Sequence, residues 1–102
     1  MIVRISKGAF PPHRLREAEE ALAASEATLR PAIAPMAGLL HYYVAIDRVE
    51  GQLTNVSVWD SLEHAQAMSQ LPEMLAQRPI LESAGVTFEV ITNHDVLWSI
   101  TP

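Results

Sequence analysis

The sequence predicts one α+β domain over residues 1–102, with its elements in the order strand, helix, strand, strand, helix, strand. Three observations carry this prediction. The length is that of one ordinary domain. Short β-branched runs alternate with stretches whose core-facing residues recur every three or four positions. Prolines and glycines lie between these segments, where they interrupt regular structure. This order is a recognised plan in which helices cover one face of an antiparallel sheet.

The first strand and the first helix are predicted within residues 2–30. Residues 2–6 are mainly apolar and β-branched, and Pro11 and Pro12 prevent a central strand from continuing. From residue 13 the period changes to that of a helix, which Pro31 is expected to end. The face of this helix that is turned to the core consists of Leu15, Ala18, Leu22, Ser25 and Leu29.

A hairpin is predicted in the middle of the chain. Residues 39–46 and 52–59 are predicted as strands, and residues 47–51 form the loop between them. Gly51 is available for the positive φ that hairpin turns require.

The register of this hairpin follows from the alternation of its side chains. We expect Tyr43 to lie opposite Asn55 and His41 opposite Ser57. This pairing gives the sheet one aliphatic face and one mixed face that contains aromatic and polar residues. A slip by one residue would mix the two faces, so the pattern favours this pairing.

Residues 61–84 predict a broken helical stretch. Asp60 can cap free backbone amides, and Glu63 follows three residues later, as in a capping box. Pro72 can begin a second helical segment, and Pro79 is expected to interrupt that segment.

The end of the chain predicts a fourth strand and an apolar tail. Residues 86–92 form the strand, residues 93–95 a turn or bulge, and residues 96–100 are largely apolar again. Trp98 lies where a chain end is normally frayed. It could pack on the chain's own helix, but we expect it to pack across a subunit interface.

A homodimer is the expected assembly. Helices can bury only one face of the predicted sheet, and neither face is fully polar, so the other face is expected to meet a second sheet. The apolar content of 49% is also high for a small monomer. The predicted contact therefore comprises the sheet faces and the C-terminal segment.

Composition excludes several other partners and chemistries. Twelve acidic residues outnumber seven basic ones, and no basic stripe exists, so neither nucleic acid nor an anionic membrane surface is expected as a partner. The absence of cysteine excludes disulfides and thiolate chemistry. No apolar run reaches the roughly 20 residues of a membrane span, and the N-terminus lacks the apolar core of a signal peptide. The expected location is the cytoplasm.

Two of the four histidines are candidate catalytic bases. His41 lies on the mixed sheet face, and His64 lies in the first helical turn, where the helix dipole favours neutral imidazole. The ordinary alternative, a hydrogen-bonded or solvated histidine, stays open for both. His13 and His94 are expected to be solvated or structural. The histidine spacings match no metal-binding motif, so no metal site is predicted.

Tyr43, Asn55 and Trp59 are the candidate pocket residues. The two aromatic side chains could form walls of a pocket, and Asn55 could donate a hydrogen bond to a ligand. The alternative stays open that Tyr43 and Trp59 only pack in the hydrophobic core. The chain has no GxSxG, GxGxxG or phosphate-loop motif, so hydrolase and nucleotide-binding functions have no support.

Two segments resemble a known family. The opening Met-Ile-Val-Arg-Ile is similar to the start of antibiotic biosynthesis monooxygenase (ABM)-like proteins, and residues 56–63 resemble their junction between the third strand and a helix, with its Trp-x-Ser motif. The resemblance implies a ferredoxin-like fold that dimerises into an α+β barrel. It also matches Trp59 to the family tryptophan and Asn55 to polar residues of the family pocket. Haem degradation is not expected, because residues 2–6 lack the asparagine that haem-degrading members use.

The expected function is a small-molecule-binding protein with cofactor-independent monooxygenase activity on an activated phenolic substrate. His41 or His64 would remove a proton from the phenol, so that oxygen could attack the phenolate. No cofactor is expected. Two alternatives stay open, namely a non-catalytic dimeric ligand-binding or accessory protein and an isomerase or mutarotase on the same fold.

Overall fold

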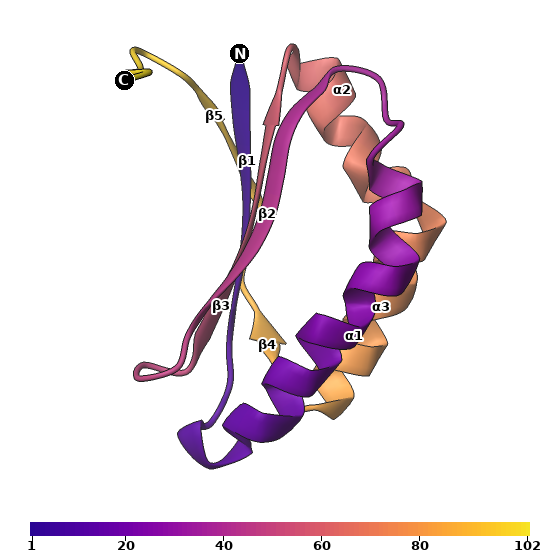
Figure 1. Ribbon diagram of the computed structural model, residues 1–102, viewed down its shortest axis with the longest axis vertical. Coiled ribbons are helices and arrows are strands. Elements are labelled where there is room, and N and C mark those ends of the chain that lie inside the picture. The colour runs from indigo at the N-terminus through magenta and orange to yellow at the C-terminus, as the bar shows by residue number, and fades with distance from the viewer.

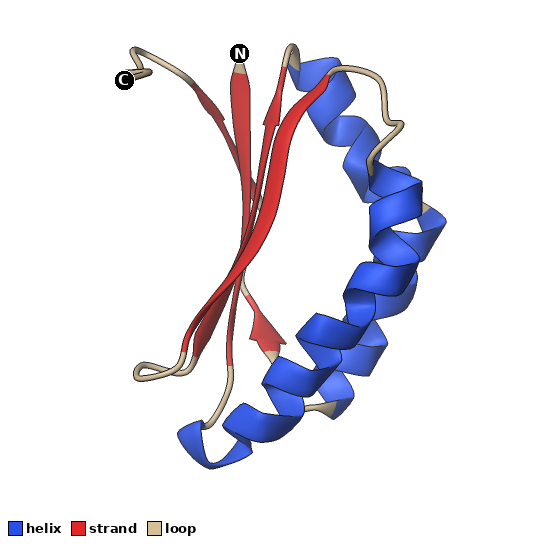
Figure 2. Ribbon diagram, viewed as in Figure 1, coloured by secondary structure: helices blue, strands red, loops and turns tan.

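The computed structural model describes residues 1–102 and has the predicted α+β architecture (Figure 1). Helices form one layer and strands the other, and all of the helices lie on the same side of the sheet (Figure 2). No helix is both long and apolar enough to cross a bilayer. The strands are β1 (Ile2–Ala9), β2 (Leu39–Asp47), β3 (Gln52–Trp59), β4 (Thr87–Phe88) and β5 (Thr92–Asp95), and the helices are η1 (Pro12–Arg14), α1 (Leu15–Ile33), α2 (Leu62–Ala67), η2 (Met68–Gln70) and α3 (Pro72–Ser83).

The sheet is antiparallel throughout, and its order is β2-β3-β1-β4, with β5 also paired to β1. The predicted fourth strand is therefore divided. Phe88 pairs with Gly8, but Thr92 pairs with Ile5, so residues 89–91 lie opposite only residues 6–7. This is a β-bulge, which bends an edge strand. The predicted turn or bulge at residues 93–95 was wrong, because these residues pair with β1 and the bulge lies before them.

The predicted register of the β2–β3 hairpin was wrong by one residue. Tyr43 lies opposite Val56, and Tyr42 lies opposite Ser57. The loop contains residues 48–51 rather than five residues, because Asp47 still pairs with β3. A local hydrogen-bond pattern sets this shorter loop, in which the Asp47 carboxylate accepts backbone amides of residues 49 and 50 at 3.0 Å each.

The corrected register redistributes the side chains between the two sheet faces. Tyr42 and Val44 share the helix-covered face with Asn55 and Ser57. His41 and Tyr43 share the outer face with Val56 and Val58. The alternation within each strand was predicted correctly, whereas the pairing between the strands was not.

Both helical boundaries set by prolines also differ from prediction. Pro31 and Pro79 lie inside α1 and α3, respectively, instead of ending or interrupting a helix. Both prolines are exposed, so the carbonyl that loses its bond in the preceding turn can be hydrated. α1 continues far enough to bury Ile33, which is 2% exposed.

The start of α2 is capped by Ser61 rather than by Asp60. The Ser61 hydroxyl accepts the backbone amide of His64 at 3.2 Å. Asp60 instead accepts a hydrogen bond from the His64 ring, and this contact lowers the pKa of the Asp60 carboxyl.

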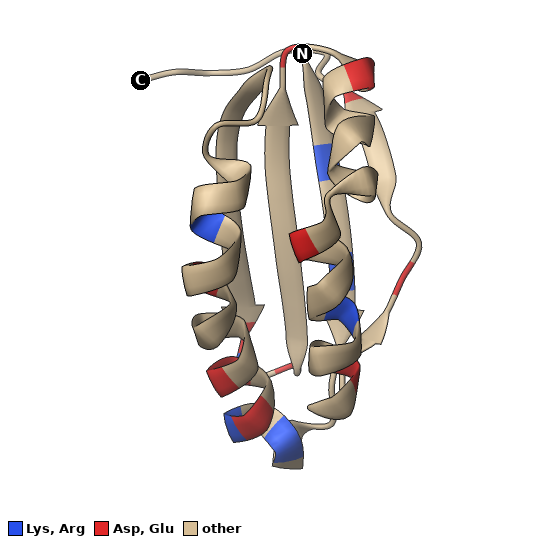
Figure 3. Cartoon of the chain, turned by 90° about the vertical axis from the view of Figure 1, so that its right-hand side faces the viewer, with Lys and Arg blue, Asp and Glu red and all other residues tan.

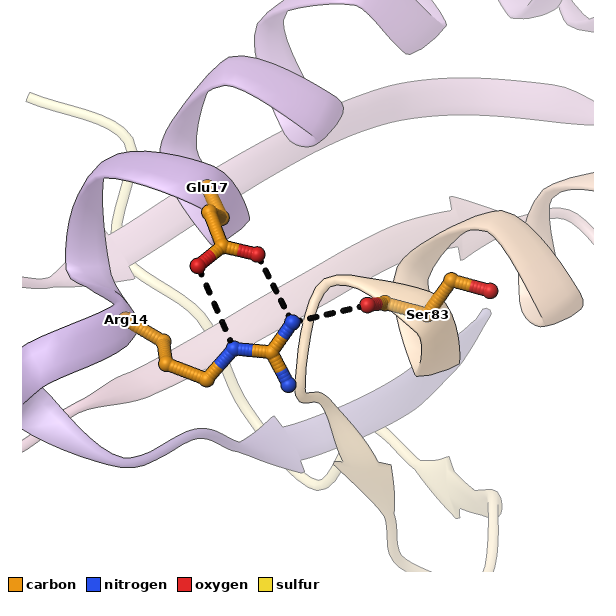
Figure 4. Close-up of polar contacts among 3 residues, drawn as sticks. All are labelled: Arg14, Glu17 and Ser83. Atoms are coloured by element: carbon orange, nitrogen blue, oxygen red, sulfur yellow. Dashed lines mark hydrogen bonds and ion pairs between the residues drawn. The ribbon is translucent and has the colours of Figure 1, made fainter.

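Arg14 ties the beginning of α1 to the end of α3 (Figure 4). Its guanidinium donates to the Glu17 carboxylate at 2.7 Å and to the Ser83 carbonyl at 2.8 Å. The second bond satisfies one of the carbonyls that α3 leaves free at its C-terminus. Arg14 thereby helps to hold the two long helices side by side.

The hydrophobic core consists of two separate clusters. One lies where α2 meets the sheet, and the other lies at the end of the sheet near the β2–β3 loop. Between them the helix-covered space contains buried polar residues, among them Arg4, Ser57 and Gln77. The first cluster comprises Ile2, Leu29, Ile33, Trp59, Ala65 and Met68, and the second comprises Phe10, Ala18, Leu53, Leu81 and Val86.

Candidate functional site

A cavity of about 290 Å³, here called the inner cavity, lies between the sheet and the helices, where the core is divided. The floor comes from β1, β2 and β3, and the roof from α1, η2 and α3. The bulged segment at residues 89–91 contributes Glu89 and Ile91 to one side. The principal floor residues are Arg4, Ser6, Tyr42, Val44, Leu53 and Asn55, and the principal roof residues are Leu22, Leu29, Met68, Met74, Gln77 and Leu81.

A row of three residues crosses the floor. Arg4 on β1 and Tyr42 on β2 both pair with Ser57 on β3. Neighbouring strands are about 4.8 Å apart, so the Arg4 and Tyr42 backbones are separated by roughly 10 Å. Ser57 is small, and its hydroxyl accepts a hydrogen bond from the Trp59 indole N–H at 2.7 Å, which holds the Ser57 side chain close to the sheet. The long side chains on either side therefore extend into the same space.

Asn55 orients the Tyr42 hydroxyl. The Asn55 amide nitrogen donates to the Tyr42 oxygen at 2.7 Å. The Tyr42 proton is therefore available for a ligand. Burial raises the pKa of the Tyr42 phenol, while the hydrogen bond from Asn55 and the nearby charge of Arg4 oppose this rise. Tyr42 is thus a neutral hydrogen-bond donor at neutral pH.

The titration of Tyr42 tests this environment. The chain has two tyrosines, so Tyr43→Phe leaves Tyr42 as the only phenol. We expect its absorbance change at alkaline pH to have a midpoint above 10.0, the ordinary value. Because the folded pKa lies above the unfolded one, the stability contributed by neutral Tyr42 is fully present below pH 10 and decreases as pH rises through the folded pKa. A midpoint at or below 10 in the folded protein would contradict the described burial.

Arg4 is the buried charge of the inner cavity. Its side chain lies at the centre of the sheet and the residue is 5% exposed. Burial lowers the pKa of the Arg4 guanidinium, although an arginine remains charged at neutral pH. No protein group forms a hydrogen bond or an ion pair with it.

A second hollow of about 560 Å³ lies between α1 and the edge strand β2, on the other side of a wall that includes Leu29 and Tyr42. Its arginines are already neutralised, since Arg30 bonds Glu26 and Arg48 bonds Glu19. No buried charge lies in it, whereas the inner cavity contains buried Arg4. The inner cavity is therefore the better candidate site.

Comparison with known proteins bears on this architecture. No family model matches the sequence, and no curated protein matches it. Solved structures do match. A Deinococcus radiodurans protein assigned as an antibiotic biosynthesis monooxygenase is 22% identical, with a TM-score of 0.69 over 100% of this chain and 98% of that one. The chain has the fold of the antibiotic biosynthesis monooxygenases.

Two further structures share this monooxygenase fold. SnoaB of Streptomyces nogalater, described as a cofactor-independent oxygenase, is 15% identical, with a TM-score of 0.69 over 99% of this chain and 97% of SnoaB. Rv0793 of Mycobacterium tuberculosis is 18% identical, with a TM-score of 0.69 over 99% and 100% of the two chains. The predicted ferredoxin-like fold is confirmed.

The residues singled out in the sequence occupy four places in this monooxygenase fold. Asn55 lies in the floor of the inner cavity. Trp59 is 0% exposed in the first core cluster, next to the floor through its bond to Ser57 but outside the lining. Asn55 therefore lines the cavity, whereas Trp59 lies behind the floor and does not line it.

His41, Tyr43 and His64 lie outside the inner cavity. His41 and Tyr43 are on the outer sheet face, where their rings contact edge to face with centroids 5.2 Å apart. His64 is near the surface, and its Nδ1 lies 2.6 Å from the Asp60 carboxylate. No group of three His, Asp or Glu residues is placed to hold a metal ion.

Sequence reasoning missed Arg4, Tyr42 and Gln77. A signal for Arg4 was present, because a charged residue occupied an inward position of a mainly apolar segment of the central strand. Tyr42 alternates with His41 and Tyr43, so the predicted register put it on the aliphatic face and its hydroxyl was not considered. Gln77 gave no signal, because its burial depends on how α3 lies over the sheet.

Proposed function

We propose that this protein is a small-molecule-binding monooxygenase that acts on an activated phenolic substrate and needs no metal or flavin. The observation that carries the proposal is the inner cavity, whose walls are mainly apolar while Tyr42 and Asn55 present polar atoms at its floor. Such a site suits a flat aromatic ring with few oxygen substituents. The fold shared with SnoaB supports the proposal.

The proposed reaction converts an activated CH₂ group beside a phenolic ring into a ketone. Loss of one C–H proton leaves a resonance-stabilised carbanion, whose electron pair forms a C–O bond to O₂. The peroxide formed takes up one proton. Loss of the second C–H proton then breaks the O–O bond, so one oxygen atom stays in the ketone and the other leaves as water.

Tyr42 and Glu89 are the groups proposed to assist this reaction. Tyr42 would donate a hydrogen bond to the oxygen on which negative charge develops. Glu89 is the carboxylate in the lining and is proposed as the proton acceptor. His41 and His64, suggested as bases from the sequence, lie outside the cavity and are not used in this proposal.

Oxygen uptake with anthrone-like phenols and hydroquinones tests the proposal. We expect turnover by the purified protein in the presence of a metal chelator and without added flavin. Tyr42→Phe and Asn55→Ala should each lower kcat/KM by about 10- to 100-fold. The first removes the hydrogen bond to the developing charge, and the second removes the bond that orients the Tyr42 hydroxyl. Glu89→Gln should lower kcat with little change in folding stability.

Matched variants make this test specific. The double variant His41→Ala/His64→Ala should retain turnover within about twofold, because neither side chain lines the cavity. Glu63→Gln changes an exposed carboxylate outside the lining and should also be neutral. Absence of oxygen uptake by the unmodified protein, or loss of turnover in the histidine variant alone, would contradict the proposed chemistry.

Ligand binding without turnover is a second candidate function. The observation that favours it is that the lining contains no histidine and only one carboxylate, which lies exposed at the bulge. An aromatic phenol that binds the cavity but consumes no oxygen would support this function. Turnover that proceeds equally well under anaerobic conditions would instead indicate an isomerase.

We also propose that the chain forms a homodimer through its outer sheet face and its C-terminal segment. No helix covers the outer face, where Ile5, Val56 and Tyr43 form one row across the strands. Trp98 does not pack on its own helix, since it is 77% exposed. Leu97 and Ile100 beside it are 91% and 76% exposed. Exposed apolar surface of this kind is typical of an interface.

Light scattering tests the dimer. The unmodified protein should have twice the chain mass of 11.2 kDa at micromolar concentration. Val58→Arg places a charge on the outer face and should return the mass to that of one chain. Gln66→Arg adds the same charge on the exposed surface of α2 and should leave the dimer intact. An unmodified protein that scatters as a single chain would overturn the assembly.

A further inference from the structure

We propose that the inner cavity takes an apolar ligand that carries one ionised oxygen group, either a carboxylate or an acidic enolate or phenolate, and that Arg4 binds this group. The inference rests on the proposed function for its site and narrows the substrate class from phenols in general to organic anions. It depends on binding alone and does not require turnover.

Arg4 differs from every other arginine in the chain. Each of the others pairs with a glutamate at the surface, as Arg14 does with Glu17 (Figure 4). Charged residues lie mainly along the helices and at their ends, and the strands carry few (Figure 3). Arg4 is the buried exception and is the one arginine that has no carboxylate.

The position of Arg4 makes this absence informative. β1 is paired on both sides, so the Arg4 backbone cannot move toward solvent without disrupting the sheet. Every fully buried side-chain nitrogen or oxygen atom in the structure has a hydrogen-bond partner. The unbonded guanidinium nitrogens of Arg4 therefore face the cavity that Arg4 lines. A guanidinium held there without a counter-charge destabilises the ligand-free protein, and an anionic ligand would remove that cost.

Further unsatisfied donors surround the same space. The Tyr42 hydroxyl lies in the same floor row and has its proton free. Gln77, in the roof, is 7% exposed, and its side-chain amide has no hydrogen-bond partner in the protein. An oxyanion beside Arg4 could accept hydrogen bonds from the sheet below and from α3 above. A carboxylate or enolate oxygen suits this set of donors.

The other charges of the lining lie at its margin. Arg78 is exposed, stacks on Phe88 with its guanidinium 5.5 Å from the ring centroid, and lies 3.7 Å from the Glu82 carboxylate. Glu89 is also exposed, and it forms no ion pair with Arg4. Because solvent screens the charges of both groups, Arg4 makes the largest contribution to the electrostatic potential inside the cavity. The rest of the ligand would contact the apolar residues Leu22, Leu29, Met68, Met74 and Leu81.

The experiment compares an anion with a neutral molecule of nearly the same shape. Calorimetric binding is measured under anaerobic conditions for benzoate and 2-naphthoate and for the amide of each. We expect at least one of the two carboxylates to bind the unmodified protein about 10- to 100-fold more tightly than its amide, the range expected for a charge-assisted hydrogen bond. Arg4→Met should abolish this preference. It should weaken binding of the carboxylate and leave the dissociation constant of the amide within about threefold of that of the unmodified protein.

Control variants separate binding by Arg4 from a general effect of charge. Arg78→Met removes a positive charge from the margin of the same cavity and should preserve the preference. Arg4→Lys keeps the charge without the planar fork and should retain part of it. Arg4→Gln replaces Arg4→Met if the methionine variant fails to fold, as judged by circular dichroism.

Two results would overturn the inference. One is equal binding of carboxylate and amide by the unmodified protein, including no binding of either carboxylate at millimolar concentration. The other is an unchanged preference in Arg4→Met. The anaerobic measurement involves no oxygenation, so failure of the proposed monooxygenase activity would leave a positive result intact. Turnover of a neutral phenol without any carboxylate preference would instead support the activity and reject the role of Arg4.

Discussion

Replacing Trp59 with alanine is expected to lower the free energy of unfolding by about 3–5 kcal/mol. The indole is 0% exposed and belongs to the core cluster that joins α1, α2 and the sheet. Its removal leaves a large void and also takes away the N–H that bonds Ser57 at 2.7 Å. Since small domains are stable by only about 5–15 kcal/mol, urea denaturation should show a large decrease in midpoint.

Trp98→Ala is the matched control for this prediction. Trp98 is the other tryptophan of the chain and is 77% exposed. At concentrations low enough for the chain to be monomeric, its removal should change the free energy of unfolding by less than about 0.5 kcal/mol. At higher concentrations it should weaken association, if the C-terminal segment reaches across the proposed dimer. Similar losses of monomer stability in both variants would contradict the described burial.

Replacing Arg4 with methionine is expected to stabilise the ligand-free protein by about 1–3 kcal/mol. Methionine has a similar length, is flexible, and fills apolar space without requiring a counter-charge. Because the inner cavity admits some solvent, the gain should lie toward the lower end of that range. Thermal unfolding should show an increase of several degrees for a chain of this size. The same variant should lose the preference for carboxylates, so stability and binding would change in opposite directions.

Arg16→Met is the control for this substitution. The Arg16 side chain is 90% exposed and pairs with Glu20 one helical turn away. Such a pair contributes little, so the variant should change stability by less than about 0.5 kcal/mol. If Arg4→Met instead lowers the free energy of unfolding by more than about 1 kcal/mol, the guanidinium supports the fold itself and its unpaired state has another explanation.

The order of the elements was predictable from the sequence because it depends on short-range patterns. The helix over α1 followed from a three-to-four-residue repeat that ended in buried Leu29. The alternation in β2 and β3 correctly separated Tyr42 from Tyr43. These patterns report which residues of one segment face the same way, and this requires no knowledge of the neighbouring segment.

The register between strands was not predictable in this way. It was set by the hydrogen bonds of Asp47 in the loop and by an irregularity between Leu39 and His41. Both features are local to β2 and its loop, but they change which β3 residue lies opposite each residue of β2. A difference of one residue moved Tyr42 beside Asn55 and carried His41 and Tyr43 to the outer face.

The sequence by itself determined the α+β element order, the two faces of β2 and of β3, and the candidacy of Asn55 for the site. Only the tertiary structure decided that Arg4, Tyr42 and Gln77 lie around one cavity, because they come from three distant segments. It also decided that Arg4 has no partner. The carboxylates of the chain are numerous, but the fold pairs five of them with other arginines at the surface and leaves none within ion-pair distance of this one. Whether a buried charge is satisfied depends on distances in space, which the order of residues along the chain does not specify.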